Sequence, residues 1–140
     1  MSIDNLLQQL VFQDGLIPAV IVEVDGQVLT LCYLNREALE KTLETGLVHV
    51  LRRSRGVVML KGEISGHTQR LKEVRTDCEG KSLMLVVAQK VAACHAGYRT
   101  CYYRRYRPAD DSLEVCEERV FDPDRVYGSA GPRRQEDGAR

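Results

Sequence analysis

Three cysteines are spaced so that they could hold a metal ion. Cys94 and Cys101 lie seven positions apart across a glycine, and Cys78 lies sixteen residues before Cys94. Thiolates suit zinc, and three protein ligands leave the fourth position for a water whose pKa zinc lowers to about 7. His95, directly after Cys94, strengthens this interpretation. The alternative is that the thiols are separate and behave as small apolar residues.

A second group joins basic and hydroxyl side chains around a predicted turn at residues 52–56. Its members are Arg52, Arg53, Ser54, Arg55, Lys61, Ser65 and His67. Guanidinium groups bind phosphate bidentately, so the group predicts a phosphate site on a small nucleotide-like ligand. Arg53, Arg55 and Lys61 are the predicted phosphate ligands. The alternative is a solvated turn.

Two carboxylates flank the first of the three cysteines. Asp77 and Glu79 are two positions apart, so in an extended chain both point to the same side. Their oxygens are the ligands that Mg²⁺ prefers. Lys81, the next residue on that face, argues against a tight cation site, and an acidic turn is the alternative.

Four tyrosines alternate with arginines between residues 98 and 107, which resembles a platform for stacking bases. Ordinary strand alternation explains the same pattern. Lys plus Arg and Asp plus Glu are equal at 20 each, so the formal net charge is zero. Zero net charge excludes bulk attraction to nucleic acid or to an anionic membrane. We therefore expect neither as a partner.

The elements that must position these groups follow from apolar periodicity and turn signals. The 140 residues predict one α+β domain, a small, mostly antiparallel sheet with one or two helices. We expect helices over 1–10 and 36–44, and strands over 19–24, 28–33, 47–51, 57–60, 69–76, 83–87 and 102–106. The domain is predicted to span 1–122, with a polar tail over 123–140 that frays.

The sequence also bears on where the protein works. The first ten residues lack a basic segment, and no apolar run reaches 18 residues, so we expect neither a secretory signal nor a membrane span. An odd number of cysteines is not a disulfide framework, and we expect the protein in the cytoplasm. Cys32, in a predicted strand, is expected in the core, and Cys116 has no evident role.

Several short segments, taken in order along residues 12–107, resemble the phosphoribosyl-AMP cyclohydrolase family. They are residues 14–19, 33–35, 53–55, 61–63, 65–67, 77–78 and 94–101. The resemblance implies an intertwined homodimer with zinc at the interface, held by Cys78 of one chain and Cys94 and Cys101 of the other. It also implies hydrolysis of N1-(5-phosphoribosyl)-AMP in histidine biosynthesis, by zinc-bound hydroxide, with magnesium on the acidic residues.

Some positions depart from the family pattern. Its three aspartates become Asp77, Glu79 and Lys81, which makes Mg²⁺ binding doubtful and lets Lys81 meet phosphate instead. In the family's aromatic-Ser-Arg-Ser-Arg motif, Leu51 replaces the aromatic residue and Arg52 replaces the first serine. In its Lys-Gly-Glu-Thr/Glu-Ser-Gly motif, Ile64 replaces the polar fourth residue.

Three functional hypotheses follow from these matches and departures. The first is the family reaction, with His95 as the catalytic proton-transfer group. The second is a repurposed paralogue that hydrolyses a C–N bond in a different nucleotide or amidine-containing heterocycle. The third is a non-catalytic nucleotide- or zinc-binding module.

Overall fold

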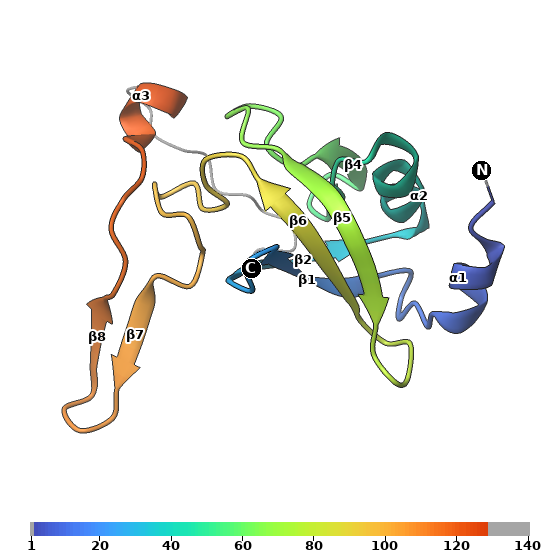
Figure 1. Ribbon diagram of the computed structural model, residues 1–140, viewed down its shortest axis with the longest axis horizontal. Coiled ribbons are helices and arrows are strands. Elements are labelled where there is room, and N and C mark those ends of the chain that lie inside the picture. Colours follow the sequence, from blue (N-terminus) through green and yellow to red (C-terminus); the bar gives the residue numbers. More distant parts are fainter. Residues whose placement is uncertain (1, 129–140) are drawn as a thin grey trace.

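The computed structural model describes residues 2–128 and is built around a four-stranded sheet with the strand order β2-β1-β6-β5 (Figure 1). The strands are β1 (Ile17–Glu23), β2 (Val28–Leu34), β5 (Gln69–Thr76) and β6 (Leu83–Gln89). β1 pairs with β2, and β5 with β6, as antiparallel hairpins, whereas the central pair β1 and β6 is parallel. The sheet is thus two hairpins joined side by side, and the prediction of a mostly antiparallel α+β domain is confirmed.

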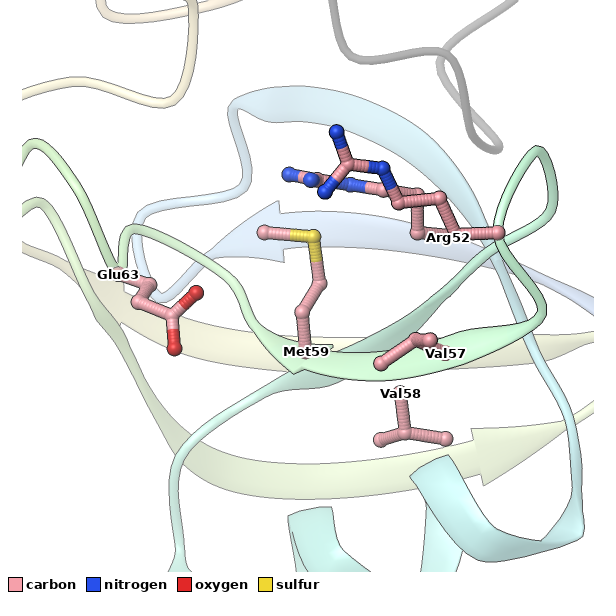
Figure 2. A pocket seen from close by; sticks show the side chains of 6 residues that line it. Arg52, Val57, Val58, Met59 and Glu63 are labelled. Carbon is pink, nitrogen blue, oxygen red and sulfur yellow. The ribbon is translucent and has the colours of Figure 1, made fainter.

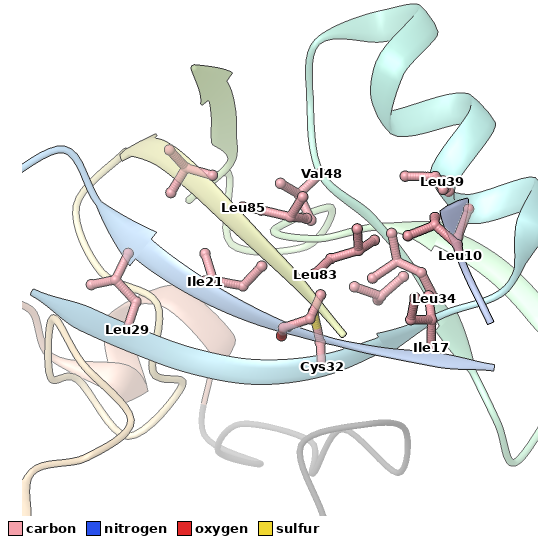
Figure 3. Packing of buried hydrophobic residues seen from close by; sticks show 14 residues of the cluster. Leu10, Ile17, Ile21, Leu29, Cys32, Leu34, Leu39, Val48, Leu83 and Leu85 are labelled. Carbon is pink, nitrogen blue, oxygen red and sulfur yellow. The ribbon is translucent and has the colours of Figure 1, made fainter. Parts of the chain in front are cut away.

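The core lies on one face of this sheet (Figure 3). In β6 buried and half-buried residues alternate, as expected for a strand whose successive side chains point to opposite faces. Ile21 and Leu85, paired in register on the two central strands, are both fully buried. Cys32 is 4% exposed and belongs to this cluster, so its predicted place in the core is confirmed.

Helix α2 (Arg36–Thr45) covers part of the core. It begins at Asn35, whose side chain accepts a hydrogen bond from Ala38 N at 2.8 Å, and it ends at Gly46 in the left-handed conformation. Beside it, β3 (His49–Arg52) and β4 (Val57–Leu60) form a separate two-stranded sheet. This small sheet carries the arginine turn between its strands.

Three further elements are short. Helix α1 (Asp4–Gln9) precedes β1, and β7 (Arg104–Arg107) pairs with β8 (Ser112–Val115) in a hairpin that stands apart from the main sheet (Figure 1). Helix α3 (Pro123–Tyr127) lies within the segment predicted to fray, and the rest of that segment from residue 129 is outside the described residues. Among residues 2–128, no helix combines the length and hydropathy needed to cross a bilayer.

Candidate functional site

The loop after β6 brings Cys94 and Cys101 together. Backbone hydrogen bonds fold it back on itself: Ala93 N donates to Arg99 O at 2.9 Å, and Cys94 N donates to Tyr98 O at 3.1 Å. Cys101 N then donates to Leu29 O at 2.7 Å, which ties the loop to β2. The two thiols of one chain end within hydrogen-bonding distance of each other.

The surroundings of the pair favour one thiolate. The hydrogen bond from Cys94, assisted by one from the Thr30 side chain and by the positive charge of Lys61, lowers the pKa of Cys101 to about 6. The same shared proton, together with burial, raises the pKa of Cys94. Ala96 N also donates to Cys94 Sγ at 3.4 Å. Two adjacent sulfurs, one readily ionised, fit a soft metal ion such as zinc.

A buried ion pair holds this loop against the sheet. Glu23, at the end of β1, is 6% exposed and pairs with Arg99 in the loop, Nη2 to Oε2 at 2.9 Å. The same carboxylate accepts a hydrogen bond from Gln89 N at 2.9 Å. Arg99 also donates to Val91 O at 3.4 Å. These bonds join β1, the end of β6 and the cysteine loop.

A pair of buried glutamines connects two loops at the same end of the sheet. Gln69 Nε2 donates to Gln89 Oε1 at 2.7 Å, and Gln89 Nε2 donates to His67 O at 3.2 Å and to Ala92 O at 3.1 Å. The pair therefore links the loop that carries Ser65 and His67 with the start of the cysteine loop. Sequence reasoning missed both glutamines and Glu23. For Glu23 and Gln89 the signal was a polar residue at the end of an otherwise apolar strand, whereas Gln69 begins a strand rich in charged residues.

The segment after β8 packs on the same region. Val120 N donates to Gly97 O at 2.8 Å, and the Phe121 ring meets the His67 ring edge-on with centroids 4.8 Å apart. The Tyr127 side chain is hydrogen bonded to that of Ser65, and burial raises the pKa of Tyr127. Phe121 and Tyr127 thus line the site beside the predicted residues Ser65 and His67, although sequence reasoning placed no functional group there.

Cys78 precedes β6, whereas Cys94 and Cys101 follow it, so Cys78 lies toward the opposite end of this strand, and it is exposed. Seven strand residues separate the two ends, a distance of about 20 Å at roughly 3.3 Å per residue. Two sulfurs on one zinc ion, each at about 2.3 Å, lie within roughly 5 Å of one another. Within residues 2–128 of a single chain, no three His, Cys, Asp or Glu side chains converge as a metal-binding group. A site that uses Cys78 together with Cys94 and Cys101 therefore needs two chains.

The residues around Cys78 form a turn and not an extended segment, so the expected alignment of the two carboxylates is wrong. Asp77 Oδ1 accepts hydrogen bonds from Glu79 N at 3.0 Å and Lys81 N at 2.9 Å, and its Oδ2 accepts one from Ser82 Oγ at 2.6 Å. These bonds, led by that from Ser82, lower the pKa of Asp77. Glu79 pairs with Lys81 at 3.4 Å. Both carboxylates have partners, and this donor set does not fit Mg²⁺.

The predicted phosphate ligands are separated in the structure. The Arg53 guanidinium lies over the Tyr33 ring, 4.5 Å from its centroid, whereas Arg55 lines a pocket beside β4. Lys61 is 6% exposed, and its charge acts on Cys101. Ser54 lies at the exposed tip of the turn. His95 is half-buried next to Cys94.

Two of the four tyrosines between residues 98 and 107 pack against each other, whereas Tyr102 and Tyr106 are exposed. The rings of Tyr98 and Tyr103 stack with centroids 3.9 Å apart and planes 7° apart. Arg119 lies over the ring of Tyr98, and Arg104 lies over the ring of Tyr103. Tyr98 and Tyr103 therefore serve internal packing of the segments that flank β7.

Comparisons with known proteins agree with the motifs along this site. The family model for phosphoribosyl-AMP cyclohydrolase matches residues 30–103, more than half of the chain. The chain is 50% identical over 118 residues to the phosphoribosyl-AMP cyclohydrolase of Methanosarcina barkeri, covering 84% of this chain and 88% of that protein. It is 51% identical over 105 residues to that of Methanothermobacter thermautotrophicus, covering 74% and 75%.

A longer relative is the histidine biosynthesis bifunctional protein HisIE of Pyrococcus furiosus. It is 43% identical over 126 residues, and the match covers 84% of this chain but only 60% of that protein. The family model and these relatives place the chain among the cyclohydrolases, enzymes that hydrolyse a C–N bond within a cyclic amidine. More narrowly, the chain belongs to the phosphoribosyl-AMP cyclohydrolase family.

Proposed function

We propose that this protein hydrolyses N1-(5-phosphoribosyl)-AMP and opens its adenine ring between N1 and C6, as a step of histidine biosynthesis. The observation that carries the proposal is the thiol pair Cys94 and Cys101, which lies inside the segment matched by the family model. The names of the curated relatives support the same substrate.

We further propose that the enzyme is a homodimer and that zinc is held between its chains. Cys94 and Cys101 of one copy supply two ligands, and Cys78 of a second copy supplies the third. The separation of the two ends of β6 and the exposure of Cys78 support this arrangement. Zinc in this position would lower the pKa of a coordinated water to about 7.

Side chains of the protein itself would transfer the proton and bind the substrate. As the N1–C6 bond breaks, N1 must receive a proton, and we assign this transfer to His95, the half-buried residue that follows Cys94 in the sequence. Burial and the charge of Lys90 lower the pKa of His67, which keeps this imidazole neutral and able to accept a hydrogen bond from substrate. Ser65 and the arginines of the β3–β4 turn bind polar and phosphate groups.

Mixing two inactive variants tests the shared site. Cys78→Ser and Cys94→Ser each remove a ligand from every site of their own homodimers. A mixed dimer has one doubly mutated site and one intact site. We expect each variant alone to lack turnover and zinc, and the refolded mixture to regain both. A mixture that stays inactive and zinc-free while the wild type binds zinc would contradict a shared site.

The departures at Lys81 and Ile64 favour a second candidate, a related substrate hydrolysed by the same thiol site. Lys81 forms an ion pair with Glu79 where the family pattern has aspartates, and Ile64 is 65% exposed in the loop before Ser65. Direct assay of the wild type with N1-(5-phosphoribosyl)-AMP separates the two candidates. If turnover is weak and Lys81→Asp combined with Ile64→Thr restores it, the second candidate holds.

A further inference from the structure

The segment of residues 119–127 leads from the β7–β8 hairpin to α3 (Figure 1) and packs on the cysteine loop. Val120 N donates to Gly97 O at 2.8 Å. Arg119 pairs with Tyr98 in an isolated β-bridge, and its guanidinium lies over the Tyr98 ring. The family model matches residues 30–103, so this segment lies outside the part of the chain that the model describes.

The sequence of α3 turns a tyrosine toward the protein. Asp122 caps the helix, because its side chain accepts a hydrogen bond from Asp124 N at 3.0 Å. Pro123 is the first helical residue, where its missing N–H needs no partner, and it is buried. Tyr127 comes four residues after Pro123 and therefore lies on the same, inward face of the helix.

Segment 119–127 contacts two predicted substrate-binding residues of the loop between β4 and β5. The Phe121 ring meets the His67 ring edge-on, with centroids 4.8 Å apart. The Tyr127 side chain is hydrogen bonded to that of Ser65, and the charge of Cys94 acts on it. Tyr127 thus lies between a residue of the β4–β5 loop and the thiol pair.

The same loop also contributes to a different region. Glu63 lines the pocket beside β4, and in Figure 2 it lies opposite Arg52, with Met59 between them. Ser65, two residues further along, is instead bonded to Tyr127. The pair formed by Tyr127 and Ser65 is therefore separate from the arginine pocket.

The bonds of Ser65 and Tyr127 leave one hydroxyl hydrogen over. Each hydroxyl carries a single hydrogen to donate and can also accept. Ser65 Oγ accepts a hydrogen bond from His67 N at 3.2 Å, which uses a lone pair and no hydroxyl hydrogen. One of the two hydroxyl hydrogens makes the bond between Ser65 and Tyr127. The pair therefore keeps a second hydrogen with which it can donate to a ligand.

We propose that Tyr127 and Ser65 act as one hydrogen-bond donor to the base of the substrate, which makes Tyr127 a substrate-positioning residue. The inference rests on the proposed function, because a purine base whose ring opens at the thiol pair carries nitrogen acceptors. Since segment 119–127 is bonded to the cysteine loop at Gly97, the donor keeps a fixed place relative to the thiols.

Removal of single hydroxyl groups tests the pair. Tyr127→Phe keeps the ring and should raise KM for N1-(5-phosphoribosyl)-AMP about tenfold with little change in kcat, because the bond is made in the ground state and the transition state alike. Ser65→Ala should have the same effect. Each hydroxyl orients the other, so the double variant should also lose about tenfold, whereas independent groups would lose about a hundredfold. Losses that multiply would overturn the pair.

Tyr106→Phe is the matched control. The Tyr106 hydroxyl donates to Asp111 at 2.7 Å on the exposed β7–β8 hairpin, so its removal should leave KM unchanged. If Tyr127 only anchors segment 119–127, Tyr127→Phe should lower the melting temperature while KM stays the same. That result would overturn the proposal, and a raised KM with an unchanged melting temperature would support it.

Binding of adenosine 5′-monophosphate, measured by calorimetry, separates this proposal from the proposed function. If the wild type fails to turn over N1-(5-phosphoribosyl)-AMP but binds this probe, and Tyr127→Phe weakens the binding, the proposed function fails and the donor pair stands. If turnover occurs and Tyr127→Phe changes neither KM nor probe binding, the donor pair is overturned and the proposed function stands. Absence of both turnover and probe binding would overturn both.

Discussion

The two ends of β6 carry the three candidate zinc ligands, and they are constructed in opposite ways. The end with Cys94 and Cys101 is held by a buried ion pair and a buried glutamine pair. The end with Cys78 is an exposed turn whose polar groups bond to one another. If zinc is shared between two chains as proposed, the pair of ligands that must keep a fixed geometry would lie in the more tightly bonded part, and the single ligand for the second chain would lie at the surface.

The largest expected difference between the two ends is in their ion pairs. Glu23→Ala removes the buried partner of Arg99 and should lower the free energy of unfolding by about 3 kcal/mol, measured by urea denaturation. Glu79→Gln removes the exposed partner of Lys81 and should change it by less than about 0.5 kcal/mol. Equal losses would show that the two ends do not differ in this way.

Each end of β6 has a glycine with no room for a side chain, so substituting either glycine should destabilise the protein to a similar extent. Gly97 has φ +102°, and an added Cβ would lie 2.7 Å from Phe121 O. Gly80 has φ +68°, and an added Cβ would collide with Gln9 O. Each glycine-to-alanine change should therefore cost about 2 kcal/mol of unfolding free energy by the same measurement. If Gly80→Ala is tolerated and Gly97→Ala is not, the difference between the ends extends to the backbone.

The acidity of the buried thiol gives a smaller effect at the rigid end. In metal-free protein we expect Cys101 to ionise with a pKa of about 6, followed by the ultraviolet absorbance of the thiolate. Thr30→Val removes a hydrogen bond to the thiolate and should raise this pKa by about one unit. Thr45→Val, on the exposed side of α2, is the control and should leave it unchanged.

The smallest effect concerns the turn at Cys78. The pKa of Asp77 is lowered, so its stabilising bonds are complete above the ordinary value of 3.8 and are lost as the pH falls through the lowered one. Asp77→Asn should therefore lower the melting temperature slightly at pH 7, and the difference from wild type should disappear at strongly acidic pH. A difference that persists there would mean that the carboxylate charge is not the cause.

The sequence carried enough information for the local elements and for the pair of thiols. Asn35 and Gly46 mark the ends of α2 by side-chain and backbone preferences that act within a few residues. Cys94 and Cys101, seven positions apart across Gly97, indicated that both thiols belong to one short segment, and the structure folds this segment back on itself. In each case the determining interactions are between residues only a few positions apart in the sequence.

What could not be predicted depends on contacts between distant parts of the chain. Glu23 meets Arg99 only because β1 and β6 pair in parallel, and Tyr127 reaches Ser65 only because the segment after β8 returns to the site. The arginine turn was recognised, but the different directions of Arg52 and Arg53 depend on the ring of Tyr33. The short elements β8 and α3 bury too little apolar surface to show a periodic pattern.

The parallel pairing of β1 with β6 also has a consequence for the order of folding. Each hairpin, β1–β2 or β5–β6, can form from residues that are close in sequence. The contact between the two hairpins instead closes a loop of about half the chain, which has a larger cost in conformational entropy. The loop with the two thiols follows β6 and bonds to Leu29 on β2, so it acquires its shape only after that closure. In a newly made chain, Cys94 and Cys101 would therefore come together only late, after the two hairpins have joined.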